Sequence, residues 1–269
     1  MIMKNLSLVF LAFTLVISFA SCGNKKTNDP NYIKVGVASG PEFVIAEAAK
    51  KVAKEKYGLE VELIQFNDYI MPNTSLDQED IDLNVFQTRP FLDEQVSRRG
   101  YKFAVVGNTF VYPMAGYSKK IKTLDELKNG STIVIPNDLA NSSRALLLLQ
   151  KVGLIKLKDG VTTPRLVDIV ENSKKFEILE LEAPQLPRVL DDAKVTLSVI
   201  NNNFAGQAGL LLKDGVFAED KESPYVNLIV SREDNKDEDK VKKFVQSYQS
   251  DEVEKVANEA FKGGAVKGW

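Results

Sequence analysis

The chain has 269 residues, of which 44% are apolar and 27% charged, a balance typical of a folded soluble protein with one or two domains. Its 35 basic and 37 acidic residues give a net charge of −2, which provides no electrostatic case for nucleic-acid binding. The absence of His excludes His-based catalytic triads and His metal sites, and the single Cys excludes an internal disulfide and a cysteine zinc site.

The N-terminal 21 residues are typical of a lipoprotein signal peptide. Lys4 provides a positive start, and residues 6–19 form an apolar run that is short for a membrane span. Two small residues then precede Cys22, so we expect cleavage before this Cys and its lipidation. The alternative is an ordinary signal peptide that leaves a free thiol, which is unusual in an exported protein. Residues 22–31 are polar and predict a flexible tether to the folded body.

After the tether, the sequence predicts alternating strands and helices. A strand at 32–37, a helix from Pro41 to Gly58 and a strand at 60–66 form a βαβ unit, whose crossover length favours a parallel sheet. The next predicted elements are a short irregular helix from residue 67, a strand at 81–86 and a helix at 90–99.

The stretch at 103–117 is rich in β-formers but contains Pro113, which predicts a connector or an edge that runs between two sheets. The alternation of strand, turn and helix then restarts without a close sequence repeat. The predicted elements are a short helix capped at 123–126, a strand at 133–135, a helix that ends at Gly153, strands at 177–181, 195–200 and 225–231, a helix at 184–191, and two amphipathic helices at 241–248 and 253–261.

This pattern predicts an α/β fold with two lobes and a cleft between them. With chain crossings near Phe110 and Tyr225, residues 32–110 and 226–269 would form lobe I, and residues 111–225 would form lobe II. Ligands of such sheets bind at the carboxyl ends of strands, where helices begin. Turns of this kind lie at 39–40, 67–69, 86–88, 137–141 and 201–203.

The strand, turn and helix from Ile133 to Gln150 carry the clearest candidate site. Asn141 and Arg144 are three residues apart and therefore lie on one face of the helix, near its N-terminus. A cation there opposes the helix macrodipole, which is explained if Arg144 shares an anion with the free backbone N–H groups. A surface Arg beside an ordinary helix cap is the alternative that this stretch leaves open.

From Ile33 to Trp269 the chain resembles the methionine-binding lipoprotein family, MetQ/NlpA. The resemblance covers essentially the whole mature chain and rests on long, specific segments. These segments are 35–37, 54–58, 66–69, 84–87, 106–113, 136–138, 144–150, 181–187, 219–227 and 263–269.

The resemblance implies a two-lobed periplasmic-binding-protein fold, type 2-like, that needs no cofactor or metal. Such a protein delivers L-methionine, and sometimes D-methionine, to an ABC importer made of a permease and an ATPase. Arg144 and Asn141 would hold the α-carboxylate, with the bidentate fork of the Arg suited to it. The remaining implied roles fall to Asn201 and Asn227 at the amino-acid head, and to Tyr69, Phe86 and Phe91 around the thioether. Without the resemblance, core packing would explain these aromatic residues equally well, and a turn would explain the Asn run.

Two features depart from the family pattern. Thr88 and Phe91 stand where the family commonly has His and Tyr, which changes the side-chain pocket. The turn from Asn137 to Asn141 lacks the usual Pro-Thr, which alters its rigidity. Thr88 therefore joins the candidate ligand-binding residues, and it motivates an alternative in which the same fold binds another amino acid or a methionine dipeptide.

Two other classes of protein compete with a transport protein. One is a surface or outer-membrane lipoprotein with little transport role. The other is an enzyme, which we do not expect, because acidic pairs such as Asp80/Asp82 are explained as solvated charges and no nucleophile–base pair is visible. We expect a lipid-anchored protein that faces the periplasm. Gly23 after the Cys favours the outer membrane, whereas an importer partner favours the inner membrane.

Overall fold

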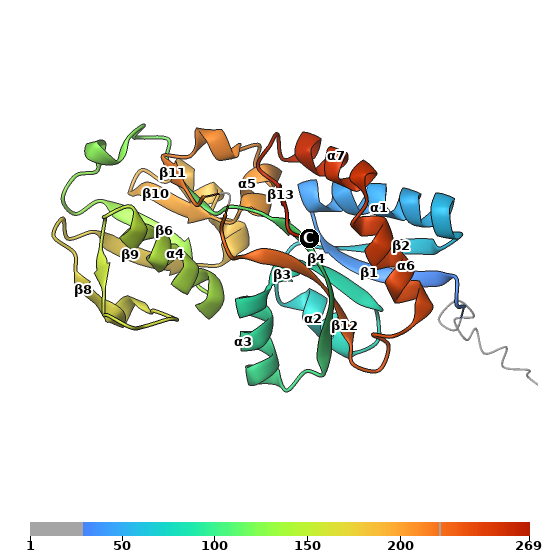
Figure 1. Cartoon of the computed structure of the whole chain (residues 1–269). Coiled ribbons are helices and arrows are strands. Elements are labelled where there is room, and N and C mark those ends of the chain that lie inside the picture. The colour runs from blue at the N-terminus through green and yellow to red at the C-terminus, as the bar shows by residue number, and fades with distance from the viewer. Residues whose placement is uncertain (1–28, 221) are drawn as a thin grey trace, which may run out of the picture.

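The computed structural model describes residues 29–220 and 222–269. The predicted signal peptide, the predicted lipidation site Cys22 and most of the predicted tether lie outside these residues. Two mixed α/β halves lie side by side, each built around its own sheet (Figure 1). Within residues 29–220 and 222–269, no helix combines the length and the apolar character that crossing a membrane requires.

The first sheet has six strands in the order β13-β4-β12-β3-β1-β2. Strand β1 is parallel to β2 and β3, whereas β12 is antiparallel to β3 and β4. The β1–α1–β2 unit is therefore the predicted parallel βαβ unit. The elements of this half are β1 (Tyr32–Ala38), α1 (Pro41–Tyr57), β2 (Glu60–Phe66), α2 (Met71–Asp77), β3 (Leu83–Thr88), α3 (Arg89–Arg99), β4 (Phe103–Val111), β12 (Val226–Arg232), α6 (Asp239–Tyr248), α7 (Asp251–Ala260) and β13 (Val266–Lys267).

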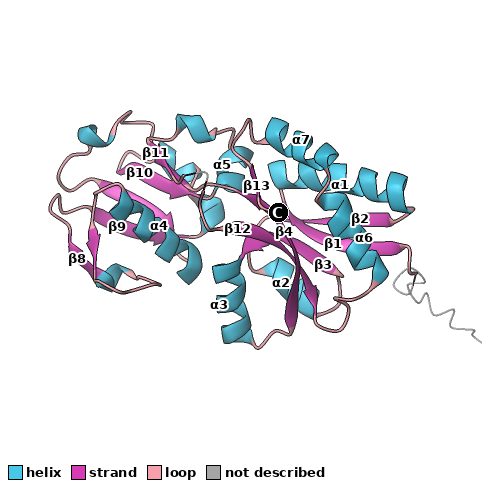
Figure 2. Cartoon of the chain, in the orientation of Figure 1, coloured by secondary structure: helices cyan, strands magenta, loops and turns pink. Residues whose placement is uncertain are grey.

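The larger core cluster of this half lies between the sheet and α1, α6 and α7 (Figure 2), and a smaller cluster includes Leu76 of α2 and Leu92 of α3. Helix α1 buries Ile45 and Ala49, one turn apart, against Val35 of β1 and Phe244 of α6. The helix ends at Gly58, whose φ of 64° is in the left-handed region that favours glycine. The apolar stripe and this stop signal explain why the sequence predicted the helix with the correct end.

The second sheet has five strands in the order β11-β5-β10-β6-β9, with β6 parallel to both β9 and β10. The elements of this half are β5 (Ala115–Tyr117), η1 (Leu124–Glu126), β6 (Thr132–Pro136), α4 (Leu139–Lys151), β7 (Lys156–Leu157), η2 (Leu166–Asp168), β8 (Ile169–Glu171), β9 (Glu177–Leu181), η3 (Ala183–Gln185), η4 (Arg188–Asp191), β10 (Val195–Ile200), α5 (Asn202–Gln207), η5 (Leu212–Asp214) and β11 (Phe217–Ala218), where η marks a 3₁₀ turn.

Two segments carry the chain between the sheets. Strand β4 belongs to the six-stranded sheet and β5 to the five-stranded sheet, and residues 112–114 join them. Residues 219–225 lead back from β11 to β12. The prediction that the stretch at 103–117 connects two sheets is confirmed, and Pro113 lies in the connection.

The predicted helix at 184–191 is wrong. Two 3₁₀ turns, η3 and η4, occupy this stretch instead. Pro187 lacks the N–H that would donate to the carbonyl of residue 183 in a continuous α-helix, so the stretch divides into two 3₁₀ turns although Leu186 keeps helical backbone angles. The predicted helix opening at 67–69 begins later, at Met71, because the Asp68 carboxylate accepts from the backbone N–H groups of Ile70 at 2.7 Å and Met71 at 2.8 Å.

Candidate functional site

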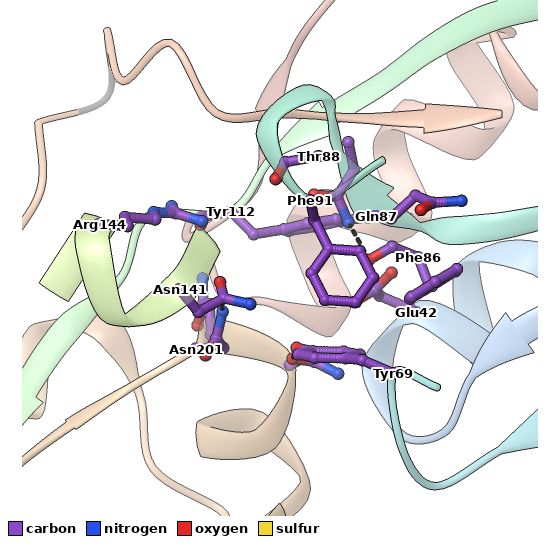
Figure 3. Close-up of a pocket in the computed structure, with 13 residues that line it drawn as sticks. Glu42, Tyr69, Phe86, Gln87, Thr88, Phe91, Tyr112, Asn141, Arg144 and Asn201 are labelled. Atoms are coloured by element: carbon purple, nitrogen blue, oxygen red, sulfur yellow. Dashed lines mark hydrogen bonds between the residues drawn. The ribbon is translucent and has the colours of Figure 1, made fainter. Parts of the chain in front are cut away.

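A polar cavity lies where the ends of strands from both sheets meet (Figure 3), and the empty space at this site is about 370 Å³ when the part open to solvent is included. The predicted turns at 67–69, 86–88, 137–141 and 201–203 all contribute to it. Every ligand-binding residue named from the sequence lines this cavity. These residues are Tyr69, Phe86, Thr88, Phe91, Asn141, Arg144, Asn201 and Asn227.

Aromatic rings form one wall of the cavity. The ring centroids of Tyr69, Phe86 and Phe91 lie 5.8 to 5.9 Å apart, and Tyr69 also packs on Phe204 of α5 at 4.9 Å. The Tyr69 hydroxyl donates to Asn203 Oδ1 at 2.5 Å. This hydrogen bond joins the loop after β2 in one half to α5 in the other, so Tyr69 both lines the cavity and bridges the two halves.

Arg144 lies at the opposite end of the cavity and is already paired. Its Nε donates to Glu219 Oε1 at 2.8 Å and its Nη2 to Glu219 Oε2 at 2.5 Å, and these two side chains are only 5% and 8% exposed. Nη2 also donates to the carbonyl of Tyr112 at 3.0 Å. The Nε–Nη2 edge, which the bidentate fork would use, therefore faces Glu219. Among the hydrogen bonds of the described residues, none uses Nη1.

Asn141 is held by the cap of α4. Its backbone N–H and its Nδ2 donate to the Asp138 carboxylate at 2.9 and 3.0 Å, and its Oδ1 accepts from Asn201 Nδ2 at 2.8 Å. Burial raises the pKa of Asp138, against these hydrogen bonds. The amide of Asn141 is thus committed to its neighbours, and it orients Asn201 so that Asn201 Oδ1 remains free to accept.

Glu42 is a lining residue that the sequence analysis missed. It lies in the first turn of α1 and is 2% exposed, with Asn227 as a side-chain hydrogen-bond partner. Burial raises the pKa of Glu42 well above its usual range, which the hydrogen bond from Asn227 only partly offsets. An acid in the first turn of a helix is ordinarily explained by the helix dipole. The available signal was that Glu42 closely follows the turn at 39–40, at the carboxyl end of β1.

Four further lining residues were not named as ligand-binding residues. Gln87 sits in a buried amide network, donating to Asn73 Oδ1 at 2.8 Å and to Asn84 Oδ1 at 2.9 Å. Two belong to the polar run after β10, which the sequence did single out as a turn at a strand end. The four residues are Gln87, Tyr112, Asn202 and Asn203.

Several buried polar atoms of this cavity lack a hydrogen-bond partner among the described residues. They are Glu42 Oε2, Asn201 Oδ1 and Asn203 Nδ2. Buried polar groups in proteins are usually satisfied, so atoms of this kind gathered in one cavity indicate a polar ligand. The described residues contain no group of three His, Cys, Asp or Glu side chains arranged to hold a metal. A cation at one end, acceptors along the side and an aromatic wall suit a small zwitterion with an apolar side chain.

We expect Tyr69→Phe to weaken ligand binding about fivefold to tenfold, since one hydrogen bond contributes about 1 kcal/mol. The substitution removes the hydroxyl that joins the loop after β2 to Asn203 of α5, while the ring stays in the aromatic wall. Titration calorimetry with methionine measures the effect. Tyr101→Phe, whose hydroxyl lies 3.5 Å from Thr74 Oγ1 and away from the cavity, is the matched control. Equal affinities for wild type and Tyr69→Phe would contradict the bridging role.

The comparisons with known proteins agree on one family. The family model described as NlpA lipoprotein matches residues 33–269. The chain is 64% identical over 255 residues to the D-methionine-binding lipoprotein MetQ of Escherichia coli strain K12, covering 94% of each chain. A crystal structure of the methionine-binding protein MetQ aligns with a TM-score of 0.88 at 66% identity, covering 90% of this chain and 99% of that one.

A nutrient-binding protein from Burkholderia cenocepacia, whose structure was solved bound to methionine, aligns with a TM-score of 0.86 at 48% identity. The alignment covers 88% of this chain and 100% of that one. The two-sheet α/β architecture described above is therefore that of periplasmic binding proteins, as predicted. With a family match over nearly all of the described residues and relatives of this similarity, the chain belongs to the NlpA lipoprotein family.

Proposed function

We propose that this protein is a lipid-anchored solute-binding protein that holds L-methionine, and also D-methionine, in the cavity and delivers it to an ABC importer. The observation that carries the proposal is the set of buried, unpartnered polar atoms in a cavity that also has an aromatic wall. The names of the similar proteins, a D-methionine-binding lipoprotein and a protein bound to methionine, support the choice of ligand.

Each end of the cavity has a role in this proposal. Arg144 Nη1 contacts the α-carboxylate, and Asn201 Oδ1 and the Glu42 carboxylate accept from the α-ammonium, with Asn227 beside Glu42. Asn141 positions Asn201 through their amide hydrogen bond. The thioether lies against the aromatic wall, where contacts between sulfur and rings are favourable, and Thr88 and Phe91 shape the space that His and Tyr usually occupy in the family.

The two sheets correspond, in this proposal, to two lobes that close on the ligand by a hinge motion. Lobe I comprises residues 32–110 and 226–269, and lobe II comprises residues 111–225. Hydrogen bonds such as the one that Gln207 Nε2 donates to the carbonyl of Ser39, at 2.8 Å, join the two lobes.

Residues 1–21 would be removed as a signal peptide, and Cys22 would carry the lipid, with residues 22–31 as the tether. Several acyl chains anchor firmly, whereas one anchors marginally. The body then faces the periplasm beside a permease and an ATPase. The sorting tendency associated with Gly23 makes the outer membrane the competing location. Catalysis is not part of this proposal, because the similar proteins bear the names of binding proteins and the cavity offers no nucleophile beside a base.

The test is titration calorimetry on the ligand-stripped body from Gly23 onward with L-methionine, D-methionine, methionine dipeptides and a panel of small amino acids. We expect submicromolar binding of L-methionine. Heat with another solute and none with methionine would keep the fold and replace the ligand. No heat with any solute would favour a surface lipoprotein without a transport role, and hydrolysis of an amino-acid derivative would favour an enzyme.

A further inference from the structure

Glu219 lies outside the cavity lining, directly behind Arg144. Arg144 lines the cavity, whereas Arg144 and Glu219 together line a second hollow with Leu148 and Tyr225. The ion pair therefore separates the proposed ligand site from the surface on its far side. Glu219 is not a direct ligand contact in this arrangement, yet its carboxylate accepts several hydrogen bonds beside the site.

The Glu219 carboxylate accepts four hydrogen bonds. Two come from Arg144 Nε and Nη2, at 2.8 and 2.5 Å. The others come from the backbone N–H of Met114 at 3.0 Å and from Ser223 Oγ at 3.2 Å. Each of these groups can donate, so the site requires a side chain with two acceptor oxygens.

These contacts join both segments that connect the sheets. Met114 lies in the segment 112–114, and Ser223 lies in the segment 219–225. Arg144 adds its own contacts to the same segments, donating to the Tyr112 carbonyl at 3.0 Å and lying with Cζ 4.3 Å from the Tyr225 ring centroid. The ion pair is thus the point at which the site residue Arg144 and both connections meet.

We propose that Glu219 is a positioning residue, which fixes Arg144 so that Nη1 faces the cavity and couples carboxylate binding to the two connecting segments. This inference rests on the proposed function, in which Arg144 holds the α-carboxylate. The inference also limits which ligands can bind. Arg144 makes a single-point contact through one nitrogen, and the ligand must carry a free α-carboxylate next to it.

The proposal differs from a purely electrostatic role for Glu219. If Glu219 only neutralised Arg144, its removal would leave a stronger cation with a free fork, and methionine would bind more tightly. If Glu219 positions Arg144, its removal releases the side chain from its orientation and methionine binds more weakly. The two outcomes have opposite signs.

The experiment compares Glu219→Gln with wild type for methionine and for methioninamide, in which a neutral amide replaces the carboxylate. In this variant an amide N–H₂ group replaces one carboxylate oxygen, so it cannot accept from Arg144 or from the backbone N–H of Met114. We expect the Kd for methionine to rise about 10- to 100-fold, the range typical of a lost hydrogen bond to a charged group, and the Kd for methioninamide to change less than about threefold. Glu219→Asp keeps the charge on a shorter side chain and should restore part of the affinity.

Asp220→Asn is the matched control, since Asp220 is adjacent, carries the same charge and pairs with Lys151 through side chains that are 69% and 58% exposed. It should bind both ligands as wild type does. If Glu219→Gln bound methionine and methioninamide more weakly by the same factor, Glu219 would have only a structural role, and the proposal would be overturned. Tighter binding of methionine by Glu219→Gln would also overturn it.

A measurement on the ligand-free protein tests whether Glu219 positions Arg144, and its result does not depend on the proposed function. In wild type, the Arg144 Nε–H signal in nitrogen NMR spectra should be protected from exchange with water, and protection should fall at least about tenfold in Glu219→Asp, following the lost hydrogen-bond geometry. Fast exchange in wild type would overturn the positioning role. Failure of wild type to bind methionine, with this protection intact, would instead refute the proposed function.

Discussion

Replacement of Arg144 by Ala is expected to remove measurable methionine binding and to lower the free energy of unfolding by about 3–5 kcal/mol. The first effect follows because Arg144 supplies the cation that faces the proposed carboxylate site. The second follows because Glu219, whose side chain is 8% exposed, is left as a buried charge without its partner. Calorimetry with methionine and urea unfolding measure the two effects, and Lys51→Ala, at a pair with Glu55 whose side chains are 75% and 62% exposed, is the control that should change neither.

A second variant separates binding from stability. Replacing both partners, with Arg144→Met and Glu219→Leu, removes the buried charges together and should recover most of the lost stability, because apolar groups of similar volume often replace a buried ion pair at no cost. Methionine binding should remain absent in this double variant. Binding in a stable double variant would show that Arg144 does not hold the ligand.

Replacement of Glu42 by Gln is expected to weaken methionine binding about 10- to 100-fold, the range of a hydrogen bond to a charged group. The same change should stabilise the ligand-free protein at neutral pH. The folded-state pKa of Glu42 is raised well above that of an unfolded Glu, which is about 4.3. The folded protein then binds more protons than the unfolded chain as the pH rises above about 4.3, so Glu42 lowers stability increasingly with pH until its raised pKa is passed. Gln has no such dependence.

Urea unfolding at pH 4 and at pH 8 measures this difference. The variant should equal wild type near pH 4 and exceed it at pH 8. Glu47→Gln, an exposed position on the same helix, should show neither effect. A stability difference that is the same at both pH values, or an unchanged methionine affinity, would contradict the role of Glu42 as the partner of the ammonium group. Weaker binding together with higher stability in Glu42→Gln is the result expected if Glu42 contributes to ligand binding and lowers the stability of the ligand-free protein.

The sequence predicted most elements because their signals are local. The apolar stripe of α1 and its stop at Gly58, the βαβ crossover length, and Pro113 in a β-rich stretch each indicated the observed structure. The helix predicted at 184–191 failed because Pro187, in the middle of this stretch, lacks the N–H that a continuous α-helix needs there.

The site was partly predictable for the same reason. Turns at the carboxyl ends of strands can be located from the sequence, and four of the five predicted turns contribute to the cavity, whereas the turn at 39–40 does not. The candidate residues themselves came from the family resemblance, and all eight line the cavity. Their roles as ligand contacts remain predictions. Glu42 was missed because a first-turn acid has an ordinary explanation in the helix dipole, and Gln87 because its amide network with Asn73 and Asn84 is assembled only in the fold.

The sequence by itself determined the family, the alternation of strands and helices, and the set of turns that carry the site, since each depends on residues close together in the chain or on long matching segments. Only the tertiary structure decided which polar atoms are free to meet a ligand. Glu219 is 75 residues from Arg144, and Asn201 is 60 residues from Asn141. Hydrogen bonds between such distant residues occupy Nε and Nη2 of Arg144 and Nδ2 of Asn201. Because each donor and acceptor has a fixed capacity, these pairings determine what remains for the ligand.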